Sequence, residues 1–255
     1  MMLCADDFAL SGAISGTIAR LARRGCVNAI SCMAALPGWP QDARLLDGIE
    51  QVECGGLGPV QVGLHLVLAS EPALGKLSIA DAEGRLPGPD RMLALSLMRR
   101  LPLGEIEAEI ERQFEAFRAA RGRAPDFVDA HQHVHLYPGI RRLVIAATGR
   151  HAPDAWVRVP SDNLPAMLAR PFAGKAIGSA LHSLGMRRQL RRAGLRCNAG
   201  FAGHYDYSGG FRGRLAAFFR RARPGHLVMC HPGSGLAAGD TIARARMEEA
   251  DVIAK

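Results

Sequence analysis

The amino-acid sequence predicts an α/β fold in which parallel strands alternate with helices. Short apolar runs recur along the chain, and the stretches between them have the residue spacing of helices. The length of 255 residues is ordinary for one α/β barrel. The composition, 48% hydrophobic and 22% charged, is that of a globular protein with a sizeable core. We therefore expect residues 1–255 to form a single domain.

Six apolar runs predict the strands of the sheet. Each run is short, and a stretch with helical spacing separates most runs from the next. The runs cover residues 1–5, 27–34, 59–68, 126–130, 155–159 and 226–230. This alternation is typical of βα units around a parallel sheet, so we expect the six strands to be parallel.

The clearest helix is predicted over residues 104–121. Apolar side chains recur at i, i+4, i+8 and i+11 from Ile106, while Glu and Arg fill the other face. Gly122 and Pro125 follow as stop signals.

Two further segments differ in composition. Six Gly and Pro residues fall between Pro72 and Pro89, which predicts a long loop, and long ordered loops are often functional. Residues 161–195 predict a basic helical insertion, whose first half is interrupted by proline and glycine. Nothing there marks the boundary of an independent domain.

The net charge of +8 raises the question of a nucleic-acid partner. Much of the excess is paired arginine, as at Arg187, Arg188, Arg191 and Arg192. With three Tyr and two Trp, the chain has no evident platform of basic and aromatic residues. We interpret the charge as a solvated surface and expect no nucleic-acid partner.

The cysteines and the N-terminus predict a cytoplasmic protein. The six cysteines are scattered without CxxC pairs, as in a protein kept reduced. No basic region followed by an apolar core opens the chain, so no signal peptide is expected. No apolar stretch reaches the roughly 18 residues that a transmembrane segment needs.

Two adjacent carboxylates, Asp6 and Asp7, close the first predicted strand in the motif ADDF. The carboxyl ends of parallel strands are where α/β folds assemble their sites. Two neighbouring buried acids repel each other, and a metal ion resolves the conflict by binding one and leaving the other as a base. The alternative is that one aspartate caps a following helix.

Three histidines alternate in the motif DAHQHVH, which begins at Asp129 after another predicted strand. If the extended geometry continues, His131, His133 and His135 lie on one face. Such a cluster indicates a metal site or catalysis more often than a structural role.

Two single histidines carry weaker signals. His65 lies in the apolar strand GLHL, where a hydrogen-bonded core histidine is the commoner case. His231 leaves the last predicted strand in the motif CHPG and can pass a proton to a leaving amine, or it is simply a turn residue. Together with the acids, these histidines suit one divalent ion, Zn²⁺ or Mg²⁺, since three protein ligands leave room for a reacting water.

These motifs resemble those of the YdjC-like carbohydrate deacetylases, a group that includes chitooligosaccharide and hopanoid-associated deacetylases. The resemblance spans ADDF, GLHL, DAHQHVH, the strand around Arg158 and CHPG, in family order. It departs at Ala9, where the family usually has glycine.

The resemblance implies a distorted, TIM-like (β/α) barrel and a metal-dependent hydrolase that acts on an acetylated amino sugar. It implies metal ligation by His65 and His131 with an Asp of the pair, which we assign as Asp7. Asp6 would be the general base, oriented by Arg158, and His231 the acid that protonates the leaving amine.

Two other functions fit the same residues. One is a metal-dependent esterase or phosphohydrolase, because fold and ligands do not fix the substrate. The other is a non-catalytic sugar-binding or nucleic-acid-binding module on a degenerate barrel. The sequence leaves the oligomeric state open, with an isologous homodimer as the commonest arrangement.

Overall fold

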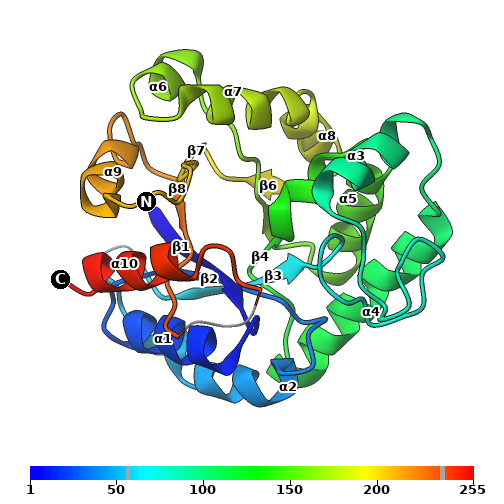
Figure 1. The fold of residues 1–255 in the computed structure, drawn as a ribbon, viewed down its shortest axis with the longest axis horizontal. Coiled ribbons are helices and arrows are strands. Elements are labelled where there is room, and N and C mark those ends of the chain that lie inside the picture. The colour runs from blue at the N-terminus through cyan, green and yellow to red at the C-terminus, as the bar shows by residue number, and fades with distance from the viewer. Residues whose placement is uncertain (56–57, 236–238) are drawn as a thin grey trace.

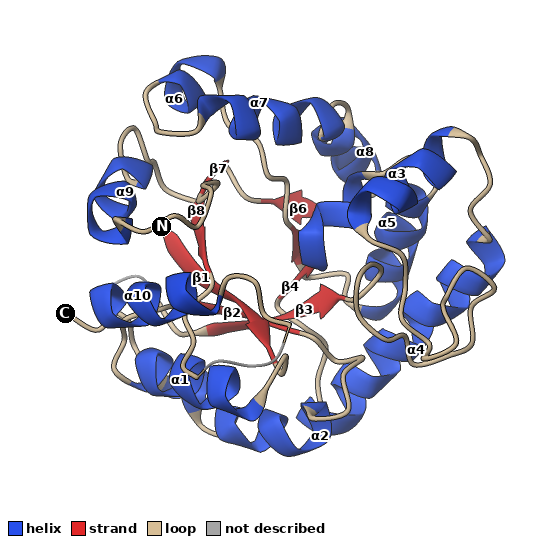
Figure 2. Ribbon diagram, in the orientation of Figure 1, coloured by secondary structure: helices blue, strands red, loops and turns tan. Residues whose placement is uncertain are grey.

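All the strands that the structure describes join one parallel sheet. The structure is a computed structural model that describes residues 1–55, 58–235 and 239–255. The strand order is β6-β5-β4-β3-β2-β1-β8-β7, and every pairing is parallel. Figures 1 and 2 show the sheet curled at the centre with helices around it. The strands are β1 (Met2–Phe8), β2 (Ala29–Cys32), β3 (Gln61–Leu66), β4 (Phe127–Ala130), β5 (Trp156–Val157), β6 (Arg196–Cys197), β7 (Gly200–Ala202) and β8 (His226–Cys230).

Helices connect the strands. The α-helices are α1 (Gly12–Arg23), α2 (Trp39–Asp42), α3 (Pro89–Leu97), α4 (Leu103–Arg121), α5 (Ile140–His151), α6 (Leu164–Leu168), α7 (Ala173–His182), α8 (Met186–Arg192), α9 (Phe211–Phe218) and α10 (Ala243–Ile253). Short 3₁₀ helices are η1 (Ala43–Leu46), η2 (Ile49–Gln51) and η3 (His131–Leu136). None of the helices within the described ranges is both long and apolar enough to cross a membrane.

The sequence predicted most of these elements correctly. Each of the six apolar runs overlaps a strand, and the helix predicted over residues 104–121 is α4. The α4 helix ends because Gly122 adopts a left-handed φ of 68°, which glycine adopts without steric cost. The Pro- and Gly-rich stretch is a loop as far as α3, which begins at Pro89. Residues 161–195 carry α6, α7 and α8.

The short strands β6 and β7 were not predicted, because neither forms an apolar run. Only two residues separate them, and both run parallel to their neighbours, β5 and β8. One extended segment, residues 196–202, therefore pairs first with one edge of the sheet and then with the other. The Asn198 side chain joins the two halves: it accepts from the Val159 amide at 2.7 Å and donates to the Gly200 carbonyl at 2.9 Å.

Side chains on one face of the neighbouring strands form two layers. The first is apolar, and the second, two residues further along each strand, is polar. Strand residues two apart share a face of the sheet. The apolar layer is a distinct buried cluster that includes Cys4, Ala29, Phe127 and Trp156. Two residues further along the same strands stand four polar side chains, Asp6, Ser31, Asp129 and Arg158. This polar layer thus rests on a packed hydrophobic floor.

Candidate metal centre

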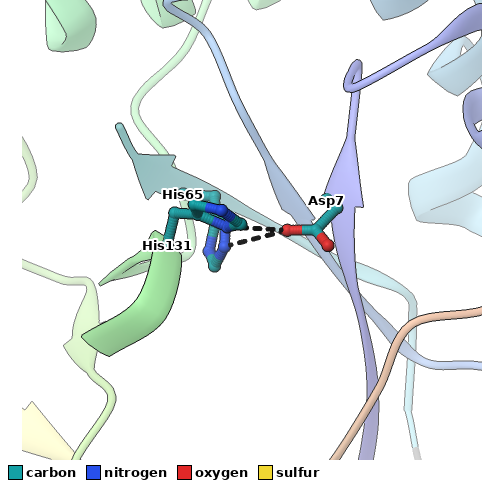
Figure 3. Close-up of side chains that lie close together, drawn as sticks. All are labelled: Asp7, His65 and His131. Atoms are coloured by element: carbon teal, nitrogen blue, oxygen red, sulfur yellow. Dashed lines mark hydrogen bonds and ion pairs between the residues drawn. The ribbon is translucent and has the colours of Figure 1, made fainter. Parts of the chain in front are cut away.

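Three side chains from different parts of the chain converge at the carboxyl ends of the strands. Asp7, His65 and His131 place one ligand atom each within 4.8 Å of the others. Asp7 Oδ1 lies 3.0 Å from His131 Nδ1 and 3.4 Å from His65 Nε2. Figure 3 shows both rings turned toward this oxygen. Asp7 belongs to β1 and His65 to β3, while His131 directly follows β4.

A bulge in β1 turns Asp7 toward this site. In a regular strand Asp6 and Asp7 would face opposite sides of the sheet. The pairing of β1 with β2 is irregular between Ala5 and Phe8, and Asp7 has a φ of 64°. Such a bulge re-aims a side chain, and here both carboxylates line one cavity. Neither caps α1, whose N-cap is Ser11.

The ring of His65 is oriented by buried partners. Its Nδ1 lies 2.6 Å from Asp129 Oδ1, which also accepts a hydrogen bond of 2.6 Å from the Ser31 hydroxyl. If Nδ1 carries the proton, Nε2 is left free toward Asp7, an arrangement common for metal-binding histidines. Burial lowers the pKa of His65, but the Asp129 carboxylate outweighs it and raises the pKa to about 10. The position therefore favours positive charge, such as a bound metal ion would supply.

Arg246, on α10, fixes the carboxylate of Asp7 from the other side. Its Nη2 donates to Asp7 Oδ2 at 2.7 Å, and its Nε donates to Asp240 Oδ2 at 2.8 Å. Burial raises the pKa of Asp7, but Arg246 and then His131 outweigh it and hold the pKa well below its usual value. Asp7 is thus ionised, with Oδ1 facing the two histidines.

Arg158 lies between the carboxylates of Asp6 and Asp129 and binds both. Its Nη1 and Nη2 lie 2.6 and 2.7 Å from the two oxygens of Asp6, in a bidentate pair. Its Nη2 also lies 2.5 Å from Asp129 Oδ2. All three side chains are fully buried, so the guanidinium holds both acids in place.

The expectation that His131, His133 and His135 share one face is wrong. The strand ends at Ala130, and η3 follows with left-handed φ values of 54° at Gln132 and 58° at His133. Because the chain coils here instead of remaining extended, His135 is turned away, while His131 and His133 line the same cavity. Only His131 reaches Asp7; His135 Nε2 lies 2.9 Å from the Arg158 carbonyl oxygen.

His231 lies on the wall of the same cavity. Burial lowers its pKa to about 4 despite the nearby Asp7 and Asp6, so the ring is neutral at pH 7. Its backbone amide donates to Glu249, which also accepts from the Tyr205 hydroxyl. Burial raises the pKa of Glu249 to about 7.

The site opens into a cavity of about 950 Å³. Besides the metal-site residues, this cavity is lined by Arg85 from the long loop, Lys175 from α7 and two tyrosines, Tyr205 and Tyr207. The tryptophans take no part, since Trp39 stacks on Phe117 in the core and Trp156 stacks on Phe127 in the floor.

Sequence reasoning missed several residues that support the site. Asp129 opens the motif DAHQHVH, but only the histidines of this motif were interpreted as site residues. Ser31 lies inside an apolar run, where a serine gives no signal. Arg246 and Glu249 lie on α10, where the spacing of apolar and charged residues is that of an ordinary surface helix. A local signal was available only for Asp129, as an acid at a strand end.

Known proteins resemble this chain over much of its length. A chitooligosaccharide deacetylase of Citrobacter koseri is 28% identical over 191 residues, 71% of this chain and 72% of that protein. One of Yersinia pestis is 32% identical over 148 residues, 57% of this chain and 54% of that protein. The second match thus spans about half of the relative's length.

A solved structure shares the fold across the whole chain. It is a protein of Enterococcus faecalis whose name proposes cellobiose-phosphate cleavage. The two align with a TM-score of 0.73 over 100% of this chain and 90% of the other, at 16% identity. This likeness confirms the α/β fold class. The family model described as YdjC-like protein matches residues 1–255, so the chain belongs to the YdjC-like family.

Proposed function

We propose that this protein is a metal-dependent hydrolase that removes the acetyl group from an N-acetylated sugar. The observation that carries the proposal is the convergence of Asp7, His65 and His131 beside a second acid, Asp6, in one cavity. The names of the Citrobacter and Yersinia relatives support the reaction and the sugar. The six free thiols suit a reducing compartment, and we propose the cytoplasm.

The donor set fits a divalent ion. Donors that share a tetrahedral Zn²⁺ at about 2.0–2.1 Å lie roughly 3.3 Å apart, close to the 3.0 and 3.4 Å separations at Asp7 Oδ1. Two imidazoles and one carboxylate favour Zn²⁺ over Mg²⁺, which prefers oxygen ligands. When bound, the ion would polarise the acetamide carbonyl and make water a better nucleophile.

Asp6 and His231 would move the protons. Arg158 fixes Asp6 through both oxygens, and the remaining lone pairs of the carboxylate can accept a proton from the attacking water. The amine that leaves needs a proton, and His231 would supply it. Because burial keeps His231 neutral at pH 7 in the free protein, it would first receive the proton that Asp6 takes from the attacking water and would then pass it to the leaving amine.

The cavity would position the sugar. Lys175 and Arg85 supply donors and Glu71 an acceptor on its wall, while the half-buried Tyr207 presents an aromatic ring. Tyrosine rings pack against sugar faces and keep a polar group for hydrogen bonding.

Acetate release tests the proposal. Metal-stripped protein would be given short N-acetylglucosamine oligomers and other N-acetyl sugars, with Zn²⁺, Mg²⁺, Mn²⁺ or Co²⁺ restored. We expect metal-dependent acetate that His131→Ala abolishes and His182→Ala, at an exposed position on α7, leaves unchanged. Phosphate or ester cleavage without amide cleavage would favour the alternative hydrolase, and folded protein that binds metal but releases no acetate would refute the proposal.

A further inference from the structure

The positive charge of the chain is concentrated in one segment. Residues 163–205 contain seven Lys and Arg and no Asp or Glu. The rest of the chain is nearly balanced, with 25 basic and 24 acidic residues. The segment therefore carries seven of the eight net positive charges, although it holds only 43 of the 255 residues.

Three of these charges are free at the surface. Arg188, Arg191 and Arg192 are exposed on α8, and within the described residues their side chains form no hydrogen bond or ion pair. Residues three and four apart share a face of a helix. Met186 and Leu190 of the same helix are buried, so the three arginines form the outer side of α8.

Exposed leucines accompany the arginines. Leu164, Leu168, Leu181 and Leu184 are 55, 60, 61 and 68% exposed. They lie on α6, on α7 and directly after it, and α7 has no buried residue at all. Figure 1 shows α6, α7 and α8 in sequence along one flank, away from α1 and α10. We call these four leucines and the three arginines the leucine–arginine face.

We propose that the leucine–arginine face docks on a bilayer surface that contains anionic phospholipid. Short amphipathic helices lie in the interface with apolar side chains among the acyl chains and basic ones at the phosphates. A second copy of this chain fits poorly, because two such faces would bring like charges together. Nucleic acid fits poorly as well, since leucines offer neither stacking nor hydrogen bonds.

The docking face shares a helix with the cavity of the metal centre. Lys175, on α7, lines that cavity and donates to the Tyr205 carbonyl at 2.9 Å. Docking would therefore bring the cavity wall close to the lipid surface. The proposal does not depend on the chemistry of the site, because lipid binding is measured without substrate or metal.

Vesicle flotation with the full chain tests the proposal. We expect the protein to bind vesicles of phosphatidylcholine with phosphatidylglycerol, less so in high salt, and not vesicles of phosphatidylcholine alone. Each basic residue near an anionic surface contributes about fivefold in binding. Replacing Arg188, Arg191 and Arg192 by Gln should therefore weaken binding at least tenfold. The matched control removes three exposed arginines elsewhere, with Gln at Arg20, Arg44 and Arg244.

A second set of variants tests the exposed leucines in the same vesicle assay. The double variant Leu181→Gln and Leu184→Gln should also lose binding, whereas Met247→Gln, at an exposed residue of α10, should keep it. Thermal melts confirm that each variant folds, which exposed substitutions should permit. Absence of binding, equal weakening by both arginine triples, or a dimer that the Leu181→Gln and Leu184→Gln variant abolishes would overturn the proposal.

Discussion

Arg246 and Asp7 lie 239 positions apart in the chain, and their side chains are joined by an ion pair of 2.7 Å. The contact occupies Oδ2 of Asp7 and leaves Oδ1 to face His65 and His131. Both partners are almost completely buried, so solvent screens the pair little. The last helix of the fold thus orients a carboxylate at the end of the first strand.

Replacing Arg246 by Leu should weaken metal binding by about 10- to 100-fold, the usual effect of removing a residue that supports a ligand. Asp7 would lose the charge that keeps it ionised and oriented. Unfolding should also become about 3–5 kcal/mol easier, because a buried carboxylate loses its partner. Calorimetric Zn²⁺ titration and thermal denaturation measure the two effects. Arg244→Leu, at an exposed position on the same helix, is the control, and equal affinities in both variants would contradict the role of Arg246.

Asp129→Asn should lower both metal affinity and acetate release by at least tenfold. Asparagine cannot hold the His65 ring through a charged hydrogen bond, and its amide would face Arg158 with less attraction. Zn²⁺ titration and the acetate assay measure the change, with Asp154→Asn as an exposed control. Normal Zn²⁺ affinity in folded Asp129→Asn would show that the acid does not support His65.

Glu249 should make the protein less stable as the pH rises. Burial raises its pKa in the folded state to about 7, above the ordinary 4.5. A raised pKa contributes stability that is fully present below about pH 4.5 and is lost as the pH rises through about 7. The full effect is of order 3 kcal/mol.

Glu249→Gln should remove this pH dependence. Urea denaturation at about pH 5 and pH 8 gives the free energy of unfolding of the variant and of the wild type. From pH 5 to pH 8 the wild type should lose more of this free energy than the variant. Glu248→Gln, on the same helix, serves as the control. If the free energies of unfolding of the wild type and of Glu249→Gln differ by the same amount at both pH values, burial does not raise the pKa of Glu249.

Gly104 in the first turn of α4 and Gly122 directly after its end should respond in opposite ways to alanine. Gly122→Ala should cost about 1 kcal/mol, because its φ of 68° is left-handed and alanine is strained there. Gly104 has no such φ, and an added Cβ would meet nothing within 4 Å, so Gly104→Ala should stabilise by about 0.5–1 kcal/mol. Thermal denaturation measures both, and a shift of the same sign for the two variants would disprove the backbone argument.

The sequence was informative where a local pattern determines structure. The apolar runs place six strands, and the i, i+4 pattern with Gly122 places α4, because both depend on neighbours in the chain. The positions of Asp7 and His131 at strand ends marked them as candidates, but the set of three with His65 was predicted from the resemblance to the YdjC-like family.

The directions in which these side chains point could not be predicted from the sequence. The bulge at Asp7 and the turn at Gln132 and His133 depend on tertiary packing, so the expected common face of the histidines failed. Arg246 gives no local signal, since only the folded chain brings α10 beside β1.

The segment of residues 196–202, which changes partners at Asn198, also bears on motion. It makes only two residue pairings with β5, as few as β5 makes with β4, so the sheet is least tightly paired around β5 and β6. Local opening would start where fewest hydrogen bonds hold. The three proposed ligands come from β1, β3 and the end of β4, which lie in the interior of the strand order. Opening around β5 and β6 would therefore leave the spacing of Asp7, His65 and His131 unchanged.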